Sequence, residues 1–237
     1  MSDGSAVVVG VGTGLGASLV RRFAAGGLDV AMAARRVERL GELADEVAGY
    51  GVEALPYACD ASDEAQVVAL FDAVEAELGP VRLVVFNAGT FEPGRIRGIA
   101  SSDFERCWRV GCLGGFLIGR EAAHRMAPRG AGTLLFTGAT ASLRGGAGFA
   151  NLAVPKFGLR ALAQTMAREL GPEGVHVAHV IIDGQIRSER YAEIARDRGP
   201  DSLLEPEAIA ESYWQLHCQP RNAWTHELDL RPWVEPF

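Results

Sequence analysis

Residues 7–25 read VVVGVGTGLGASLVRRFAA, and this stretch decides which fold the rest of the chain must match. Three consecutive valines predict a strand that is buried on both faces. A turn as tight as the one that follows needs residues without Cβ, and it lets backbone N–H groups approach a phosphate at the start of a helix. The turn carries four glycines: Gly10, Gly12, Gly14 and Gly16. We therefore interpret it as a pyrophosphate-binding loop, with a tight turn that binds nothing as the alternative.

The alternation of strand and helix that begins there continues along most of the chain. Short β-branched runs predict strands, and stretches with helical periodicity lie between them. The predicted strands cover 6–10, 28–34, 51–57, 81–86, 132–137 and 174–182, and the predicted helices cover 14–25, 37–49, 63–78, 103–126 and 151–170. The alternating stretch AWTHELDL at 223–230 adds a seventh strand, and 223–237 form the last strand and the C-terminal tail. We predict an α/β fold: a single doubly wound Rossmann-type domain over 1–237 with a parallel sheet of about seven strands.

Composition and charge exclude several classes of protein. The chain has 237 residues, of which 48% are hydrophobic and 22% are charged, and its net charge is −7. Such a composition predicts a folded chain, and the acidic balance disfavours nucleic acid and anionic membrane surfaces as partners. No run of about 18 apolar residues predicts a membrane span, and the N-terminus lacks the basic region of a signal peptide. We expect a cytoplasmic protein with no nucleic-acid partner and no membrane partner.

The cysteines and histidines predict neither disulfides nor a metal site. The four cysteines have spacings that fit no zinc motif, and we interpret them as reduced thiols of a cytoplasmic protein. His176 and His179 are three residues apart on a predicted strand, so they face opposite sides of the sheet. The other histidines have no partners at ligand spacing. The cysteines are Cys59, Cys107, Cys112 and Cys218.

The residues after the second predicted strand bear on the choice of cofactor. An acidic residue there would accept hydrogen bonds from the ribose hydroxyls of NAD, whereas an arginine suits the 2′-phosphate of NADP. Ala34 stands at the acidic position, and Arg35 and Arg36 follow it. Because arginine binds phosphate bidentately and stays charged, we predict NADP (as NADPH) rather than NAD. Two solvated arginines at the start of a helix are the alternative.

Three motifs together resemble the short-chain dehydrogenase/reductase family. They are the Gly10-x-x-x-Gly14-x-Gly16 spacing, ACDASD at 58–63 and FNAG at 86–89, and the resemblance extends over about 6–230. It implies that Asp60 reaches the adenine ring of the cofactor. It also implies that three residues support the central sheet beside the cofactor: Asn87, Ala88 and Gly89.

The segment IDGQIRS at 182–188 resembles the family's Pro-Gly segment, with Asp183 in place of the proline. By this match the backbone of Ile186 would meet the nicotinamide carboxamide, and Ser188 would meet a phosphate. The residues that follow, about 186–218, would form helices and a lid over the substrate.

The catalytic positions depart from the family's pattern. The family's reaction uses a tyrosine and a lysine at i and i+4 on one helix face, with a serine upstream and an asparagine on an earlier helix. Lys156 is present, but Leu152 stands at the tyrosine position, Ala139 at the serine position and Cys112 at the asparagine position. Phe149 occupies the tyrosine position of the enoyl reductase branch. We expect Lys156 to hold the nicotinamide ribose, with a direct catalytic role as the alternative.

Other residues near these positions offer substitutes. Cys112 is a candidate nucleophile, although we favour a small buried thiol. Tyr191 is either a proton donor that moves into the active site or an ordinary aromatic residue of the lid. Pro155, just before the lysine, either kinks the predicted helix or indicates that this helix begins late, near the proline. Three residues carry polar groups near the site: Thr140, Ser142 and Asn151.

Two classes of function remain open. The first is an NADP-dependent oxidoreductase with a non-standard active site, acting on an unidentified small molecule that needs little proton delivery, such as a polarised C=C or C=N bond. The second is a non-catalytic nucleotide-binding subunit or redox sensor.

The resemblance also implies a homodimer or homotetramer, or a hetero-oligomer with a related chain, through the helices over 103–126 and 151–170 and the last strand. Trp224 and Trp233 are the expected anchors of such an interface.

Overall fold

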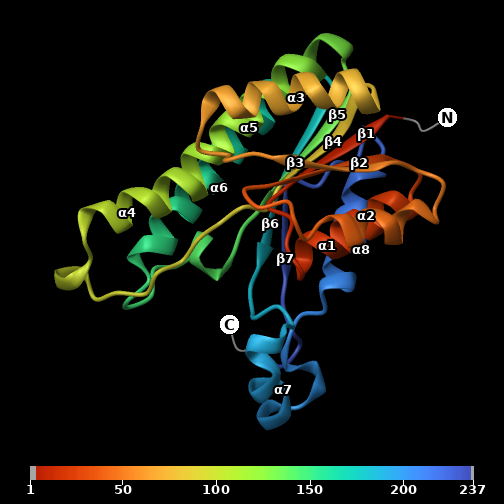
Figure 1. Ribbon diagram of the computed structural model, residues 1–237. Helices are drawn as coiled ribbons and strands as arrows, with labels where there is room; N and C mark the ends of the chain where they lie inside the picture. The colour runs from red at the N-terminus through yellow and green to blue at the C-terminus, as the bar shows by residue number, and fades with distance from the viewer. Residues whose placement is uncertain (1–3, 236–237) are drawn as a thin grey trace.

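The computed structural model describes residues 4–235, and a seven-stranded sheet forms its centre (Figure 1). The strand order is β3-β2-β1-β4-β5-β6-β7, and all neighbouring strands are parallel. The strands are β1 (Ser5–Val9), β2 (Asp29–Ala34), β3 (Ala54–Ala58), β4 (Val81–Phe86), β5 (Gly132–Thr137), β6 (Val175–Ile182) and β7 (Glu227–Leu230). The predicted α/β fold with a parallel sheet of about seven strands is confirmed.

Helices cover both faces of the sheet because its central strands are apolar on both sides. The helices are α1 (Leu15–Ala25), α2 (Gly41–Ala48), α3 (Glu64–Leu78), α4 (Ser101–Trp108), α5 (Gly114–Met126), α6 (Ala150–Leu170), α7 (Ala192–Arg198) and α8 (Pro206–His217). Figure 1 shows α1, α2 and α8 on one side of the sheet and α3, α5 and α6 on the other, and a separate apolar core lies in each layer. Within residues 4–235, no helix combines the length and the apolar character that crossing a membrane requires.

From β1 to β3 the chain adds strands on one side of β1, and from β4 onward it adds them on the other side. The point of reversal in the sheet therefore lies between β1 and β4, and it determines where a ligand can bind. β1 pairs with β2 on one side and with β4 on the other, so the connections that follow β1 and β4 diverge to opposite faces. In sheets of this kind, ligands bind in the crevice at the carboxyl ends of the strands at the point of reversal.

The predicted helix over 103–126 is interrupted in the structure. A π-helical turn at Arg109–Leu113 separates α4 from α5, and in it the N–H of Gly114 bonds to the carbonyl of Arg109. Such a turn adds one residue to the helical repeat and is frequent at functional sites. Smaller differences are that α2 begins at Gly41 rather than at 37, and that β3 covers Ala54–Ala58 rather than 51–57.

Pro155 lies inside α6, so the late start at the proline is wrong, whereas the predicted span of 151–170 agrees with the structure to within one residue. The helix begins at Ala150 and continues through the proline. A proline in a helix removes one hydrogen bond and needs room for its ring. Gly111 of the π-turn supplies that room, because a Cβ at Gly111 would lie 3.1 Å from the Cβ of Pro155. A contact between two helices therefore overrides the local preference.

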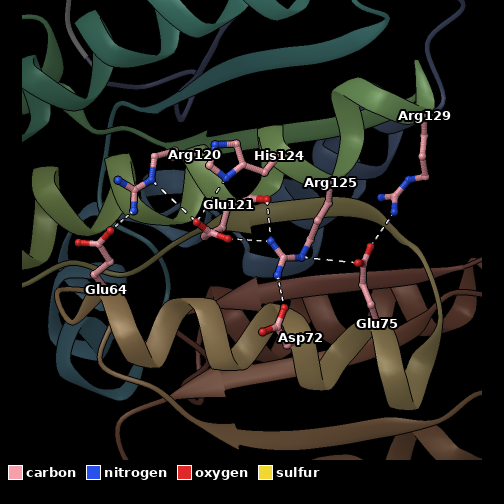
Figure 2. A network of polar contacts seen from close by, with 8 residues as sticks. All are labelled: Glu64, Asp72, Glu75, Arg120, Glu121, His124, Arg125 and Arg129. Atoms are coloured by element: carbon pink, nitrogen blue, oxygen red, sulfur yellow. Dashed lines mark hydrogen bonds and ion pairs between the residues drawn. The ribbon is translucent and has the colours of Figure 1, made fainter.

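A network of ion pairs joins α3 to α5 (Figure 2). Arg125 is its centre: its guanidinium donates to Glu121 at 2.7 Å and to Asp72 at 2.5 Å, and it lies 3.6 Å from Glu75. The side chain of Glu121 is only 8% exposed, and a buried carboxylate needs such a partner. The remaining members are Glu64, Arg120, His124 and Arg129. The network fixes α5 against α3 and thereby supports the layer that also carries α6.

Candidate functional site

The glycine loop after β1 packs directly against the loop after β4. Gly10 has a φ of +95° and donates its N–H to the carbonyl of Ala33 at 2.8 Å. A Cβ at Gly10 would lie 2.6 Å from the backbone nitrogen of Ala88, and one at Gly16 would lie 2.8 Å from the carbonyl oxygen of Gly10. By contrast, nothing lies within 4 Å of a Cβ placed at Gly12. Packing thus requires glycine at positions 10 and 16, whereas Gly12 borders open space.

A cleft of about 790 Å³ opens at the carboxyl ends of β1 to β4. Its volume is typical of cofactor sites, which span about 300–1,000 Å³. Helix α1 begins beside it with Gly14 as its N-cap, no side chain caps that end, and nothing lies within 4 Å of a Cβ at Gly14. An uncapped helix N-terminus favours an anion. Seven of the predicted cofactor residues line this cleft: Gly10, Arg35, Arg36, Asp60, Asn87, Ala88 and Gly89.

Arg35 and Arg36 are exposed on the wall of the cleft just after β2. Among residues 4–235, neither guanidinium forms an ion pair or a side-chain hydrogen bond. Arg21, which lies on the same wall, differs because it binds Glu46 through two hydrogen bonds of 2.7 and 2.9 Å. Arg35 and Arg36 can therefore receive a phosphate group without first breaking an ion pair.

Asp60 and Asn87 are oriented by hydrogen bonds at the cleft wall. The carboxylate of Asp60 accepts from the N–H of Ser62 at 2.9 Å and from its hydroxyl at 2.7 Å. Burial raises the pKa of Asp60, but these hydrogen bonds and the nearby positive charges of Arg35 and Arg109 together hold the pKa below its ordinary value. Asn87 donates from Nδ2 to the carbonyl of Gly10 at 3.1 Å and from its N–H to Val9 at 2.8 Å, which joins the loops after β1 and β4.

Lys156 is buried on α6, and its amine lies next to the inner end of the cleft. Nζ donates to the carbonyl of Thr137 at 2.6 Å, and a Cβ at Gly89 would lie 4.0 Å from Nζ. Burial lowers the pKa of Lys156 to about 8. An amine in this position can donate hydrogen bonds to a hydroxyl group and can carry a proton near neutral pH.

The positions that the resemblance assigns to tyrosine, serine and asparagine lie on three different segments. Leu152 is one turn before Lys156 on α6, and Ala139 follows the end of β5. Cys112 belongs to the π-turn, and its Sγ would lie 2.7 Å from a Cβ at Gly158 of α6. Burial raises the pKa of the Cys112 thiol, and this environment disfavours Cys112 as a nucleophile.

The polar candidates Thr140, Ser142 and Asn151 each form a hydrogen bond inside the protein. Ser142 accepts a backbone N–H of the loop after β5 at 3.1 Å. Asn151 donates to the carbonyl of Glu92 at 2.9 Å, and Thr140 donates to Asp183 at 2.5 Å. These hydroxyl and amide groups therefore hold the loops around Lys156 in place.

Ile186 and Ser188 lie outside the cleft, on the segment that follows β6. Ile186 pairs with Leu204 in an isolated parallel bridge. Tyr191 ends the short 3₁₀ turn Glu189–Tyr191 farther along this segment. The structure thus brings the predicted cofactor residues that follow β1, β2, β3 and β4 together in one cleft. Ile186 and Ser188 lie apart from them, on the segment after β6.

The partners of Asp183 are a feature that sequence analysis missed. The residue is only 1% exposed, its carboxylate accepts the hydroxyl of Thr140, and Arg231 forms a hydrogen-bonded ion pair with it. Arg144 lies 3.9 Å from the same carboxylate. The sequence signal for burial of Asp183 was its position directly after the apolar residues 180–182. Its partners are 43 and 48 residues away in the chain, so no local pattern identifies them.

His176 is engaged in packing. His176 bonds through Nε2 to the carbonyl of Thr225 at 2.8 Å and stacks on Trp224 with ring centroids 4.9 Å apart. Within the part of the chain that the structure describes, no group of three or more His, Cys, Asp or Glu residues is arranged to hold a metal ion.

Comparison with known proteins gives a consistent result. Residues 5–199 match the family model described as short chain dehydrogenase. A solved structure of a short-chain dehydrogenase from Rhodopseudomonas palustris is 39% identical with a TM-score of 0.84, and the match covers 97% of this chain and 98% of that one. A metagenomic short-chain oxidoreductase in complex with NADP is 27% identical with a TM-score of 0.85, and 99% of each chain is covered. The (21S)-21-acetoxyl-apo-melianone synthase SDR of Melia azedarach is 33% identical over 73% of this chain, which spans only 63% of that relative.

Proposed function

Because the chain belongs to the short-chain dehydrogenase/reductase family, we propose that it is an oxidoreductase that binds NADP in the cleft at the carboxyl ends of β1 to β4. The observation that carries the choice of NADP is the pair Arg35 and Arg36, which line the cleft and form no ion pair with another described residue. The NADP complex of the metagenomic relative supports the same choice. When bound, the nicotinamide ring of NADPH supplies a hydride.

The shape of the cleft fits such a cofactor. A Cβ at Gly12 or at Gly14 would project into space that no protein atom fills within 4 Å, beside the uncapped N-terminus of α1. Any side chain at these positions would occupy the volume that a pyrophosphate needs. The open space beside Gly12 and Gly14 therefore supports the assignment of this loop to the pyrophosphate.

Each part of the cofactor has residues suited to it. The turn that contains Gly10, Gly14 and Gly16 would receive the pyrophosphate, and Arg35 with Arg36 would receive the 2′-phosphate. Asp60 faces the adenine, with Asn87, Ala88 and Gly89 behind the cofactor. Lys156 would donate to the hydroxyls of the nicotinamide ribose, and the segment of Ile186 and Ser188, outside the cleft, would meet the nicotinamide end.

The active site is non-standard in this proposal. Leu152 and Ala139 provide no O–H group where a carbonyl substrate would need a proton and a hydrogen bond. The buried amine of Lys156, with a pKa of about 8, remains as the group that can hold or move a proton there. A substrate with a polarised C=C or C=N bond suits such a site because it needs little proton delivery. The same loss of O–H groups favours the second candidate, a nucleotide-binding subunit or sensor without turnover.

Calorimetric titration with NADPH and NADH tests the cofactor assignment. We expect NADPH to bind about ten- to hundredfold more tightly, the range of a charge-assisted bidentate contact. Arg35→Ala should remove most of this preference and leave NADH binding unchanged. Arg97→Ala, an exposed arginine outside the cleft, is the matched control. Equal affinities of the wild-type protein for the two cofactors would contradict the assignment.

Turnover assays separate the two candidate functions. On activated ketones and aldehydes with NADPH we expect rates lower by about 10²-fold or more than a tyrosine-bearing relative achieves, because a positioned general acid contributes about 10²–10⁴-fold. A combined Leu152→Tyr, Ala139→Ser and Cys112→Asn variant should raise ketone reduction. No rise, with NADPH still bound, would favour the subunit or sensor.

We also propose that copies of the chain assemble through α5 and α6. Three large apolar side chains are exposed on these two packed helices: Phe116 at 42%, Val154 at 45% and Phe157 at 44%. Trp233 in the tail is 82% exposed, whereas Trp224 is committed to its stack on His176. Light scattering should give a mass well above that of one chain, and Phe157→Glu should reduce it. A wild-type monomer at micromolar concentration would contradict assembly.

A further inference from the structure

The buried carboxylate of Asp183 ties together three segments that are distant in the chain. It accepts from the hydroxyl of Thr140, in the 3₁₀ turn after β5, at 2.5 Å. It also forms a hydrogen-bonded ion pair with Arg231, which follows β7. Its backbone N–H donates to the carbonyl of Leu230 at 2.8 Å. Figure 1 shows β6 and β7 running side by side into this region, so the anchor lies where both strands end.

This anchor is the first fixed point of the segment 183–188. Gly184 comes next, and a Cβ there would lie 2.8 Å from Cδ of Pro232, so the backbone is pressed against the tail. Farther along, Leu204 donates to the carbonyl of Gln185 at 2.9 Å and accepts from Arg187 at 2.8 Å. The segment is therefore held at one end by Asp183 and along its length by Leu204.

A chain of contacts connects the anchor to the inner end of the cofactor cleft. Gly89 lines the cleft and lies near Nζ of Lys156, which bonds to the carbonyl of Thr137 at 2.6 Å. Three residues after Thr137, the side chain of Thr140 meets Asp183. The anchor thus lies outside the cleft but is connected to its Gly89 end, on the side of the sheet away from β2.

We infer that Asp183 is a positioning residue that holds the segment 183–188 against the nicotinamide end of the cofactor through Thr140 and Arg231. In the family's Pro-Gly segment a proline stands at the position of Asp183, and its ring would restrict the backbone there. This chain restricts it through a buried ion pair and a hydroxyl donor. The inference rests on the proposed NADP site and adds to it a residue that acts from outside the cleft.

The test compares two ligands that share the adenine end. Adenosine 2′,5′-bisphosphate carries the adenosine and the 2′-phosphate but has no nicotinamide, whereas NADPH carries both ends. In calorimetry, Asp183→Asn should weaken NADPH by about ten- to hundredfold, the range of charge-assisted hydrogen bonds, and leave the bisphosphate within about twofold. Thr140→Val, which keeps both charges, should weaken NADPH by about two- to tenfold. It covers the case in which Asp183→Asn does not fold.

The control variant is Asp229→Asn. Asp229 lies 4.0 Å from the same Arg231 but is 41% exposed, so its loss should change neither affinity. Equal weakening of both ligands by Asp183→Asn and Thr140→Val, or no weakening of NADPH, would overturn the positioning role. A wild-type protein that binds neither ligand would instead refute the NADP site, and with it this inference. The two failures are therefore distinguishable.

Discussion

Replacing Gly10 by alanine should destabilise the whole fold, because this glycine is packed between β2 and the loop after β4. Its φ of +95° lies in the region that L-residues avoid, at a cost of about 1–2 kcal/mol. The new Cβ would lie 2.6 Å from the nitrogen and 2.7 Å from the Cα of Ala88. Both are backbone atoms, so no side-chain rotation relieves the clash, and overpacking of this kind costs about 1–3 kcal/mol.

The two contributions together predict a loss of about 2–5 kcal/mol in the free energy of unfolding for Gly10→Ala. In a chain of this length that corresponds to a fall in Tm of roughly 4–20 °C. Urea unfolding followed by circular dichroism measures the first quantity, and a thermal scan measures the second.

Gly12→Ala is the matched control in the same loop. No atom lies within 4 Å of its added Cβ, so the free energy of unfolding should stay within about 0.5 kcal/mol of wild type. The methyl group would instead project into the cleft and weaken NADPH binding. Gly10→Ala with wild-type stability, or Gly12→Ala with an equal loss, would refute the reasoning.

Two further predictions concern stability. Arg125→Met should cost about 3 kcal/mol because it leaves the buried carboxylate of Glu121 without its main partner, whereas Glu64→Gln, which breaks an exposed pair, should cost less than about 1 kcal/mol; equal effects in urea unfolding would contradict this. Burial lowers the pKa of His179 and of His217 from 6.5 to about 4, so the unfolded chain binds more protons between these values. Stability should therefore be full above pH 6.5 and fall as the pH drops towards 4, by about 1–3 kcal/mol per histidine, and His217→Asn should flatten the curve between pH 7 and pH 5.

The sequence alone was sufficient to predict the fold and several of the residues that line the cleft near β1 to β4. The run of three valines, the glycine loop and the periodic helix that follows it are local signals, since each depends on neighbours a few residues away. Alternation of such units leaves few arrangements other than a parallel sheet with helices on both faces. Arg35, Asp60 and Asn87 come together in one cleft because each follows a strand, and parallel strands end at the same edge of the sheet.

The tertiary structure decided what depends on contacts between distant segments. Pro155 continues a helix because Gly111, on another helix, leaves room for its ring. The partners of Asp183 could not be predicted, because Arg231 reaches it only once β7 has paired with β6. No local pattern encodes such partners, since burial of a charge and crowding around a ring arise only when the elements pack.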